Sequence, residues 1–286
     1  MDTGKLSVLL SGEREEVIRR VMGFRLLDDE FMKAVFDQNK EVTSLVLRII
    51  LGKPDLVVEE VRAQAVVANF VGRSISVDIL ARENGNVYNI EMQRADAGAV
   101  PRRARYHGSA LDAKELEKGA PFNELPETYV IFITERDFFG SGLPAYHFDR
   151  CCRETGSDLD DGLHIVYVNG SYRGDDDIGR LMRDFSCTSA ADMTYNELAE
   201  RVRYFKETEE GLESMSRTVE EYGDKREAKG LTEGLKQGRV EGVALGADRM
   251  ANLVAMLLKA GRTDDLQKAS TDPVYREQLF KELGIA

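Results

Sequence analysis

The stretch from Ser74 to Arg94 constrains the fold of this chain more than any other part of the sequence. Two runs of alternating apolar and polar residues flank Asn84-Gly85, the dipeptide most typical of a two-residue type I′ hairpin turn. With that turn at the centre, Asp78 lies directly across from Glu91 on the neighbouring strand. The stretch therefore predicts a β-hairpin that carries two opposed carboxylates.

Strand side chains alternate between the faces of a sheet, so Asp78, Glu91 and Gln93 share one face of this hairpin. The other face is apolar and is expected to point into the core; it consists of Val77, Ile79, Ile90 and Met92. Directly opposed carboxylates repel each other and destabilise a strand pair. Because a bound divalent cation would remove that penalty, the hairpin is a candidate metal site. The alternative is a hairpin whose acidic face is simply solvated.

Composition limits the class of protein further. The 286 residues are 42% hydrophobic and 31% charged, which is enough apolar sequence for a sizeable core. A net charge of −12 argues against indiscriminate coating of nucleic acid, although an acidic protein can carry a local basic patch. There is no leader-like or membrane-spanning run, and the three cysteines have neither a disulfide-framework nor a zinc-ligand spacing. A reducing, cytoplasmic location is expected.

Hydrophobic periodicity predicts a series of helices and strands around the hairpin. In chain order we expect helices at 26–36 and 40–51, a strand at 56–68, the hairpin, a helix at 101–118, strands at 128–134 and 163–168, a helix at 176–185 and another from 195. The run at 128–134 is apolar throughout, as in a strand buried on both faces. Three arginines in the first turn of the helix at 101–118 oppose the helix dipole and need another reason to be there.

The C-terminal part of the chain differs in composition. Apolar residues spaced by seven favour a short or imperfect coiled coil; they are Leu198, Phe205, Leu212 and Val219, partly supplemented by Val202, Met215 and Tyr222. Glycines at every fourth position follow, namely Gly230, Gly234, Gly238, Gly242 and Gly246, in either a frayed linker or a closely packed helix. A small helical cluster is expected after Met250. The predicted divisions are a lead-in (1–25), the main domain (26–207) and a helical extension (208–286).

This order of elements, with Asp78 on the second strand and Glu91-Met92-Gln93 on the third, resembles the PD-(D/E)XK nuclease superfamily. The segments 31–36, 89–93 and 102–106 are similar to one branch of it, the recombination-promoting nuclease and transposase family. The likeness covers roughly residues 25–205. It implies an α/β fold with a restriction-endonuclease-like core of order α-β-β-β-α-β, a mixed sheet flanked by helices and a helical C-terminal extension.

The resemblance also implies roles for individual residues. Asp78 and Glu91 would bind Mg²⁺, or Mn²⁺ in its place, with the backbone carbonyl of Met92, and Gln93 would position the attacking water. Gln93 stands where the superfamily usually has a lysine, and it supplies no charge and accepts protons poorly. Candidates for an additional acid are Asp29, Glu30 and Glu60. Phosphate contacts are expected from Arg94, Arg102, Arg103 and Arg105, although a solvated helix end is the alternative for the last three.

Three hypotheses for function follow. The first is a metal-dependent DNA endonuclease with catalytic residues Asp78, Glu91 and Gln93. The second is a catalytically silent nuclease fold that binds DNA or protein, favoured by Gln93 and by the net charge of −12. In the third, the tail is an oligomerising scaffold, and a homodimer through the tail is expected in each case. The dispersed histidines His107, His147 and His164 are expected to be structural or surface residues.

Overall fold

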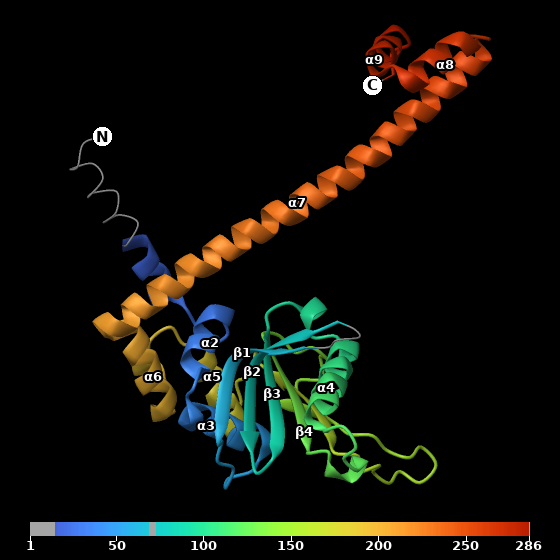
Figure 1. The fold of residues 1–286 in the computed structure, drawn as a ribbon. Helices are drawn as coiled ribbons and strands as arrows, with labels where there is room; N and C mark the ends of the chain where they lie inside the picture. Colours follow the sequence, from blue (N-terminus) through green and yellow to red (C-terminus); the bar gives the residue numbers. More distant parts are fainter. Residues whose placement is uncertain (1–14, 69–72, 286) are drawn as a thin grey trace. The chain divides into compact units, whose positions relative to one another are not determined.

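The computed structural model describes residues 15–68 and 73–285, and within them six strands form one mixed sheet (Figure 1). The strands are β1 (Glu60–Val67), β2 (Ile75–Glu83), β3 (Asn86–Gln93), β4 (Thr128–Thr134), β5 (Ala145–Phe148) and β6 (Leu163–Asn169). Their order in the sheet is β1-β2-β3-β4-β6-β5. The strands β1, β2 and β3 are antiparallel, β3, β4 and β6 run parallel, and β5 returns antiparallel to β6.

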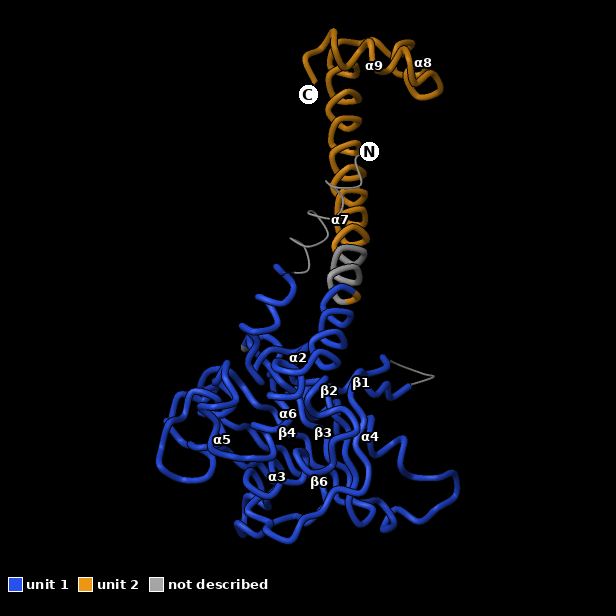
Figure 2. The backbone as a smooth tube through the Cα atoms, turned by 90° about the vertical axis from the view of Figure 1, so that its left-hand side faces the viewer, with its two compact units in different colours: residues 1–220 blue, residues 221–286 orange. Residues whose placement is uncertain are grey.

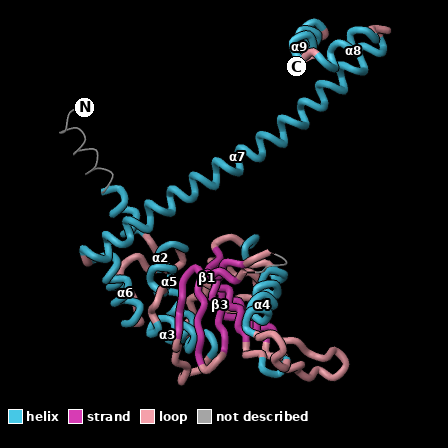
Figure 3. Tube along the Cα trace, viewed as in Figure 1, coloured by secondary structure: helices cyan, strands magenta, loops and turns pink. Residues whose placement is uncertain are grey.

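Helices cover both faces of this sheet (Figures 1 and 3). They are α2 (Asp29–Phe36), α3 (Lys40–Leu51), α4 (Pro101–Glu115), α5 (Asp177–Ser186) and α6 (Asn196–Glu207). Local sequence sets several of their ends: Asn39 caps the start of α3 by accepting from Val42 N, and Gly52 ends it with a left-handed φ of 64°. The predicted α-β-β-β-α-β core is confirmed.

The sheet separates a main apolar core from two smaller clusters. In the main core, α2, α3, α5 and α6 pack on residues such as Ile79 and Ile90. In the two smaller clusters, α4 packs on residues such as Leu80 and Phe132. Every residue of β4 is buried, as its apolar sequence predicted. The α2 and α4 helices therefore approach the central strands from opposite faces.

The hairpin forms with the predicted register. Asn84 and Gly85 both have positive φ (48° and 82°), as a type I′ turn requires. Paired residues run from Glu83 with Asn86 to Ile79 with Ile90. Ile79 and Ile90 are the last pair of this ladder, one position before the two acidic residues.

The chain divides into two compact units, Met1–Glu220 and Glu221–Ala286 (Figure 2). Within the first unit, residues 15–23 are helical, and Val21 and Phe24 are 0% and 8% exposed in the main core. The described part of the predicted lead-in therefore contributes to the main core, because its apolar side chains pack with those of α2. Residues 1–14 lie outside the described residues, and the predicted divisions at residues 25 and 207 stay predictions.

The heptad spacing after residue 195 does not describe one continuous helix. The α6 helix ends at Glu207, Thr208 is extended (ψ 148°), and α7 (Glu209–Lys259) begins at the next residue. Leu198, Phe205 and Val219 are buried in the same main core. The interval of seven therefore places apolar side chains of two helices on the core of their own unit, while the side chain of Tyr222 lies outside the described residues.

The glycines at every fourth position lie within α7, so this segment is helical rather than a linker. A Cβ added at any of the five would meet nothing within 4 Å, so no described part of the chain packs against them. The predicted closing cluster is confirmed: α8 (Thr263–Thr271) and α9 (Pro273–Glu282) bury Leu253, Leu257, Ala269, Leu279 and Phe280. Asp272 caps α9 by accepting from Val274 N and Tyr275 N.

Candidate functional site

The strands β2 and β3 separate at the two acidic residues. Asp78 N donates to Glu91 Oε1 (3.2 Å), and Met92 N donates to Asp78 Oδ2 (3.0 Å). Each carboxylate thus takes the place of a backbone carbonyl of the opposite strand. On the other side of β2, the pairing with β1 skips Gln64, whose φ is 53°. The backbone at Asp78 is therefore held mainly by side chains, and the acidic pair lies in the fork between β2 and β3.

Both carboxyl groups are largely withdrawn from water. Glu91 is 0% exposed and the side chain of Asp78 is 16% exposed. Burial, reinforced by the nearby charge of Asp78, raises the pKa of Glu91 to about 8. Burial also raises the pKa of Asp78, with Lys33 opposing the shift and Asp29 adding to it. The repulsion predicted from the sequence is therefore present, and burial makes it stronger.

Arg103 from α4 compensates Glu91. Its Nη2 lies 2.7 Å from Glu91 Oε2, its Nη1 donates to Gly98 O (2.9 Å), and its Nε donates to His107 Nε2 (3.2 Å). These contacts give the reason for a cation in the first turn of this helix, where the dipole is unfavourable.

His107 is buried (3% exposed) and supports Arg103 from the next turn of α4. Burial, followed by the charge of Arg103, lowers the pKa of His107 to about 4, so its ring is neutral near pH 7. Its Nδ1 lies 2.9 Å from the Asn89 amide nitrogen, while Asn89 Oδ1 is buried with no partner among the described residues. If the side-chain amide of Asn89 is flipped, its Oδ1 accepts from His107 Nδ1–H. His107 Nε2 can then accept from Arg103. Sequence reasoning missed this role, for which the only signal was the spacing of four from Arg103.

Lys33 from α2 compensates Asp78 from the other face of the sheet. Its Nζ lies 3.2 Å from Asp78 Oδ1 and 2.7 Å from Asp29 Oδ1. Of the candidate additional acids, Asp29 is thus brought to the acidic pair through Lys33. Glu30 follows it on α2, and no ion pair among the described residues joins Glu30 to the site. The sequence analysis missed Lys33, although its spacing of four from Asp29 is typical of a helical ion pair.

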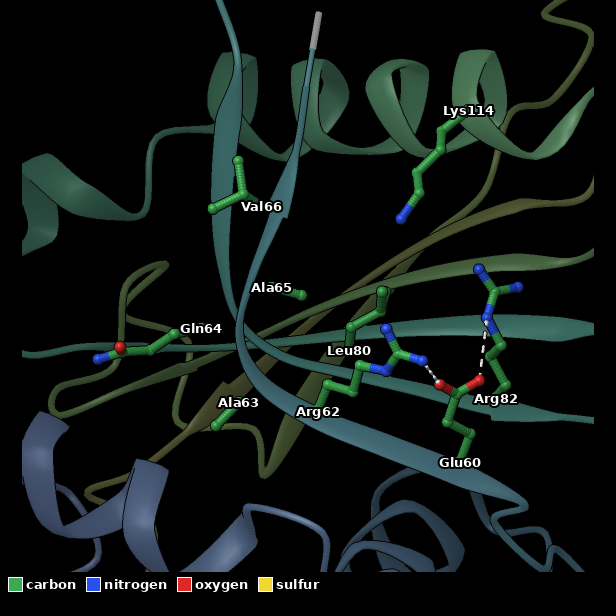
Figure 4. A pocket seen from close by; sticks show the side chains of 9 residues that line it. All are labelled: Glu60, Arg62, Ala63, Gln64, Ala65, Val66, Leu80, Arg82 and Lys114. Carbon is green, nitrogen blue, oxygen red and sulfur yellow. Dashed lines mark ion pairs between the residues drawn. The ribbon is translucent and has the colours of Figure 1, made fainter.

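Glu60 lies elsewhere. It pairs in register with Arg82, four positions along β2 from Asp78, which at about 3.3 Å per residue is roughly 13 Å away. Figure 4 shows its carboxylate between Arg62 (2.5 Å) and Arg82 (3.9 Å) in a separate pocket of about 490 Å³ that also reaches Lys114. The structure does not bring Glu60 to the acidic pair.

The four candidate phosphate-binding arginines have different surroundings. Arg94 is paired with Asp28 (3.1 Å) and Glu135 (3.3 Å), beyond the end of β3. Arg102 and Arg103 line a groove of about 780 Å³ beside the acidic pair. Arg105 is exposed on α4 and is not among the residues that line this groove.

The groove brings together the start of β2 and the first half of α4. It is lined by Arg73, Ser74, Ile75, Ser76, Ala97, Val100, Arg102, Arg103, Tyr106 and His107, with no acidic residue among them. Tyr106 is 37% exposed, and its hydroxyl donates to Arg73 O (2.5 Å). Its place in the first half of α4 puts it at the groove wall. Arg73 was not singled out from the sequence.

Gln93 is held against a glycine. The structure places Gly98, the last residue of the 3₁₀ turn Asp96–Gly98, so close that a Cβ there would lie 1.9 Å from Gln93 Oε1. Arg103 donates to the carbonyl of the same glycine (2.9 Å). Gly98 is thus the common point of contact for the neutral residue of the predicted triad and for the cation on Glu91.

Carboxylate oxygens of Asp78 and Glu91 could hold a divalent ion. A strand residue directs its N–H and C=O to the same side, and Met92 N donates toward β2, so the Met92 carbonyl also faces the fork. Two carboxylates and a carbonyl are hard oxygen donors, which suits Mg²⁺ that retains waters. Among the described residues there is no group of three or more His, Cys, Asp or Glu side chains that could hold a metal. The two carboxylates and the Met92 carbonyl suit an ion that completes its coordination with water.

A mixed sheet flanked by helices, with an acidic pair at the fork of its second and third strands, defines a PD-(D/E)XK nuclease-like fold. The model of the PD-(D/E)XK nuclease family transposases matches residues 29–171, and the chain belongs to that family. Searches among curated proteins and among solved structures found no match. No helix in the described ranges is long and apolar enough to cross a membrane.

Proposed function

We propose that this protein is a metal-dependent DNA endonuclease. Its family suggests a nuclease or transposase type of function. The observation that carries the proposal is the buried pair of Asp78 and Glu91, whose carboxylates are fixed across the fork by Met92 N and Asp78 N. Lys33 and Arg103 only partly offset the cost of burying these two neighbouring carboxylates, since the pKa of both stays raised. A divalent ion that neutralises them is therefore the simplest reason for the pair.

In this proposal Asp78, Glu91 and the Met92 carbonyl would hold Mg²⁺, with Mn²⁺ as a substitute. The ion would lower the pKa of a bound water and offset charge on the scissile phosphate. Gln93 holds the attacking water by hydrogen bonds, and Gly98 limits where its amide can lie.

DNA is the proposed substrate because the groove beside the acidic pair is basic, whereas the chain as a whole is acidic. Arg73, Arg102 and Arg103 line it without an acidic neighbour, and arginine forks suit phosphate oxygens. The groove ends at Arg103, which also contacts Glu91 (2.7 Å), so a phosphate in it would lie next to the acidic pair. Arg94 and Arg105 are weaker candidates, since Arg94 is already ion-paired and Arg105 lies outside the groove lining.

Plasmid nicking tests this proposal. We expect the wild-type protein to nick supercoiled DNA with Mg²⁺ or Mn²⁺ and to stop when EDTA is added. Asp78→Asn keeps the shape of the side chain and should abolish nicking, whereas Asp55→Asn, at an exposed turn residue, should not. Equal nicking by wild type and Asp78→Asn would remove the assignment of this site.

A catalytically silent module that binds DNA or protein is the second candidate. The observation that favours it is Gln93, a neutral side chain in the usual lysine position that packs on Gly98. Calorimetric titration with Mn²⁺ separates the candidates, because the nuclease requires binding that depends on Asp78 and Glu91. Absence of such binding, together with retained DNA binding, would favour the silent module.

Self-association through the C-terminal helical region is also part of the proposal. Five large apolar side chains of α7 are 61–68% exposed: Leu231, Leu235, Val240, Val243 and Leu245. Burying them against a second copy would recover about 1.5–3 kcal/mol per side chain. Sedimentation of the full chain beside a Leu231→Lys, Leu235→Lys variant tests this, since an unchanged mass would exclude these residues as the interface. The proposed compartment is the cytoplasm, which cell fractionation can test.

A further inference from the structure

A lysine reaches the acidic pair from an element other than β3. Lys33 Nζ, on α2, lies 3.2 Å from Asp78 Oδ1 and 2.7 Å from Asp29 Oδ1, and its side chain is only 16% exposed. A cation this poorly hydrated acts on its neighbours far more strongly than a surface lysine. The position of the Lys33 ammonium is fixed by one carboxylate on α2 and one on β2, so it is a structural part of the site.

The other groups near the pair do not direct a positive charge at Asp78. Gln93 is neutral and its Oε1 rests against Gly98. The guanidinium of Arg103 is engaged by Glu91, by the carbonyl of Gly98 and by His107. Because Arg103 comes from α4 on the opposite face of the sheet, its charge is directed at Glu91 rather than at Asp78.

We propose that Lys33 is the cationic residue of the active site and supplies, from α2, the positive charge that Gln93 does not. This inference rests on the proposed nuclease function. An ammonium has three N–H donors, so Lys33 can hold Asp29 and Asp78 and still donate to a phosphate oxygen or to the attacking water. It stabilises negative charge that develops beside Asp78, and it transfers no proton in this role.

The charge of Lys33 should also weaken metal binding, an effect that can be measured without activity. A positive charge 3.2 Å from Asp78 Oδ1 repels a divalent ion bound to the same carboxylate. Removing that charge should therefore tighten Mn²⁺ binding by about three- to tenfold, as calorimetry would measure. A lysine whose charge does not act on Asp78 would leave the affinity unchanged.

The decisive test moves the charge back to β3. Lys33→Met keeps most of the length of the side chain without its charge, and it should lower kcat by about 100-fold with KM for DNA within about threefold. Adding Gln93→Lys to that variant should recover at least tenfold in kcat, because a cation returns to the same carboxylate pair. A structural role for Lys33 would not be rescued by a charge on β3. Lys40→Met, at an exposed position at the start of α3, is the matched control and should leave both constants unchanged.

Three outcomes overturn the inference: cleavage by Lys33→Met at the wild-type rate, a double variant no faster than Lys33→Met, or unchanged Mn²⁺ affinity. Failure of the wild-type protein to cleave DNA is different, because it rejects the nuclease proposal. The Mn²⁺ titration still decides on Lys33 in that case, since tighter binding by Lys33→Met keeps it as the cation of the site and equal binding removes it.

Discussion

The guanidinium of Arg103 lies 2.7 Å from the carboxylate of Glu91, which is completely buried. The helix α4 begins two residues before Arg103, and its dipole disfavours a cation in this first turn. The positive charge is nevertheless needed in that turn, because its partner is Glu91 on β3. The same guanidinium reaches Gly98 O and His107, so one side chain joins the acidic pair to the wall of the groove.

Replacing Arg103 should therefore destabilise the metal-free protein. Arg103→Met leaves the carboxyl group of Glu91 buried without its partner, and we expect a loss of about 2 kcal/mol in the free energy of unfolding. Urea denaturation with EDTA measures it. Arg102→Met, at the adjacent exposed position, should change stability by less than about 0.5 kcal/mol. Equal effects of the two substitutions would contradict the contact.

The metal-free protein should lose stability as pH rises toward 8. Burial raises the pKa of Glu91 from 4.5 to about 8, so between these values the folded state retains a proton that the unfolded state has released. The contribution is fully present below pH 4.5 and is lost through pH 8, which we expect to cost about 1–3 kcal/mol between pH 5 and 8. Melting curves in EDTA should show this slope for the wild type and a flatter one for Glu91→Gln. Parallel slopes would contradict it.

An alanine at position 98 should impair catalysis more than folding. The added Cβ would lie 1.9 Å from Gln93 Oε1, so the amide at the end of a flexible side chain must move. If Gln93 positions the attacking water, kcat should fall about tenfold or more while the unfolding free energy changes by less than about 1 kcal/mol. Gly23→Ala, where the new Cβ meets nothing within 4 Å, is the control. Unchanged kcat for Gly98→Ala would argue against the role of Gln93.

Lys206 should prove a strong determinant of stability. Its ammonium is buried (4% exposed) and donates to the carbonyls of Met22 (3.0 Å), Phe24 (2.6 Å) and Thr188 (2.6 Å). Lys206→Met leaves those three acceptors without their donor and should lower the unfolding free energy by about 3 kcal/mol. The exposed Lys259→Met in the second unit should have no measurable effect on the unfolding of the first. A loss below about 1 kcal/mol for Lys206→Met would show that water replaces the ammonium.

Local sequence patterns predicted the elements of the fold because those patterns act over a few residues. The Asn84-Gly85 turn fixed the register that runs from Glu83 to Ile79, and the apolar run Thr128–Thr134 marked a strand buried on both faces. The heptad spacing is also a local pattern, so it did not reveal that the chain forms two successive helices there. A period of seven is shared by a coiled coil and by two successive helices on one core, and only the break at Thr208 distinguishes them.

The candidate site divides in the same way. By itself, the sequence determined the acidic pair, since strand alternation and a two-residue turn leave Asp78 and Glu91 facing each other. Tertiary structure alone decided which cation meets which acid: Lys33 meets Asp78 from one face of the sheet, and Arg103 meets Glu91 from the other. It also separated Glu60 from the site and left Asp29 beside it. The reason is physical, because packing of helices on opposite faces of a sheet depends on contacts between residues distant in the chain, which no local pattern records.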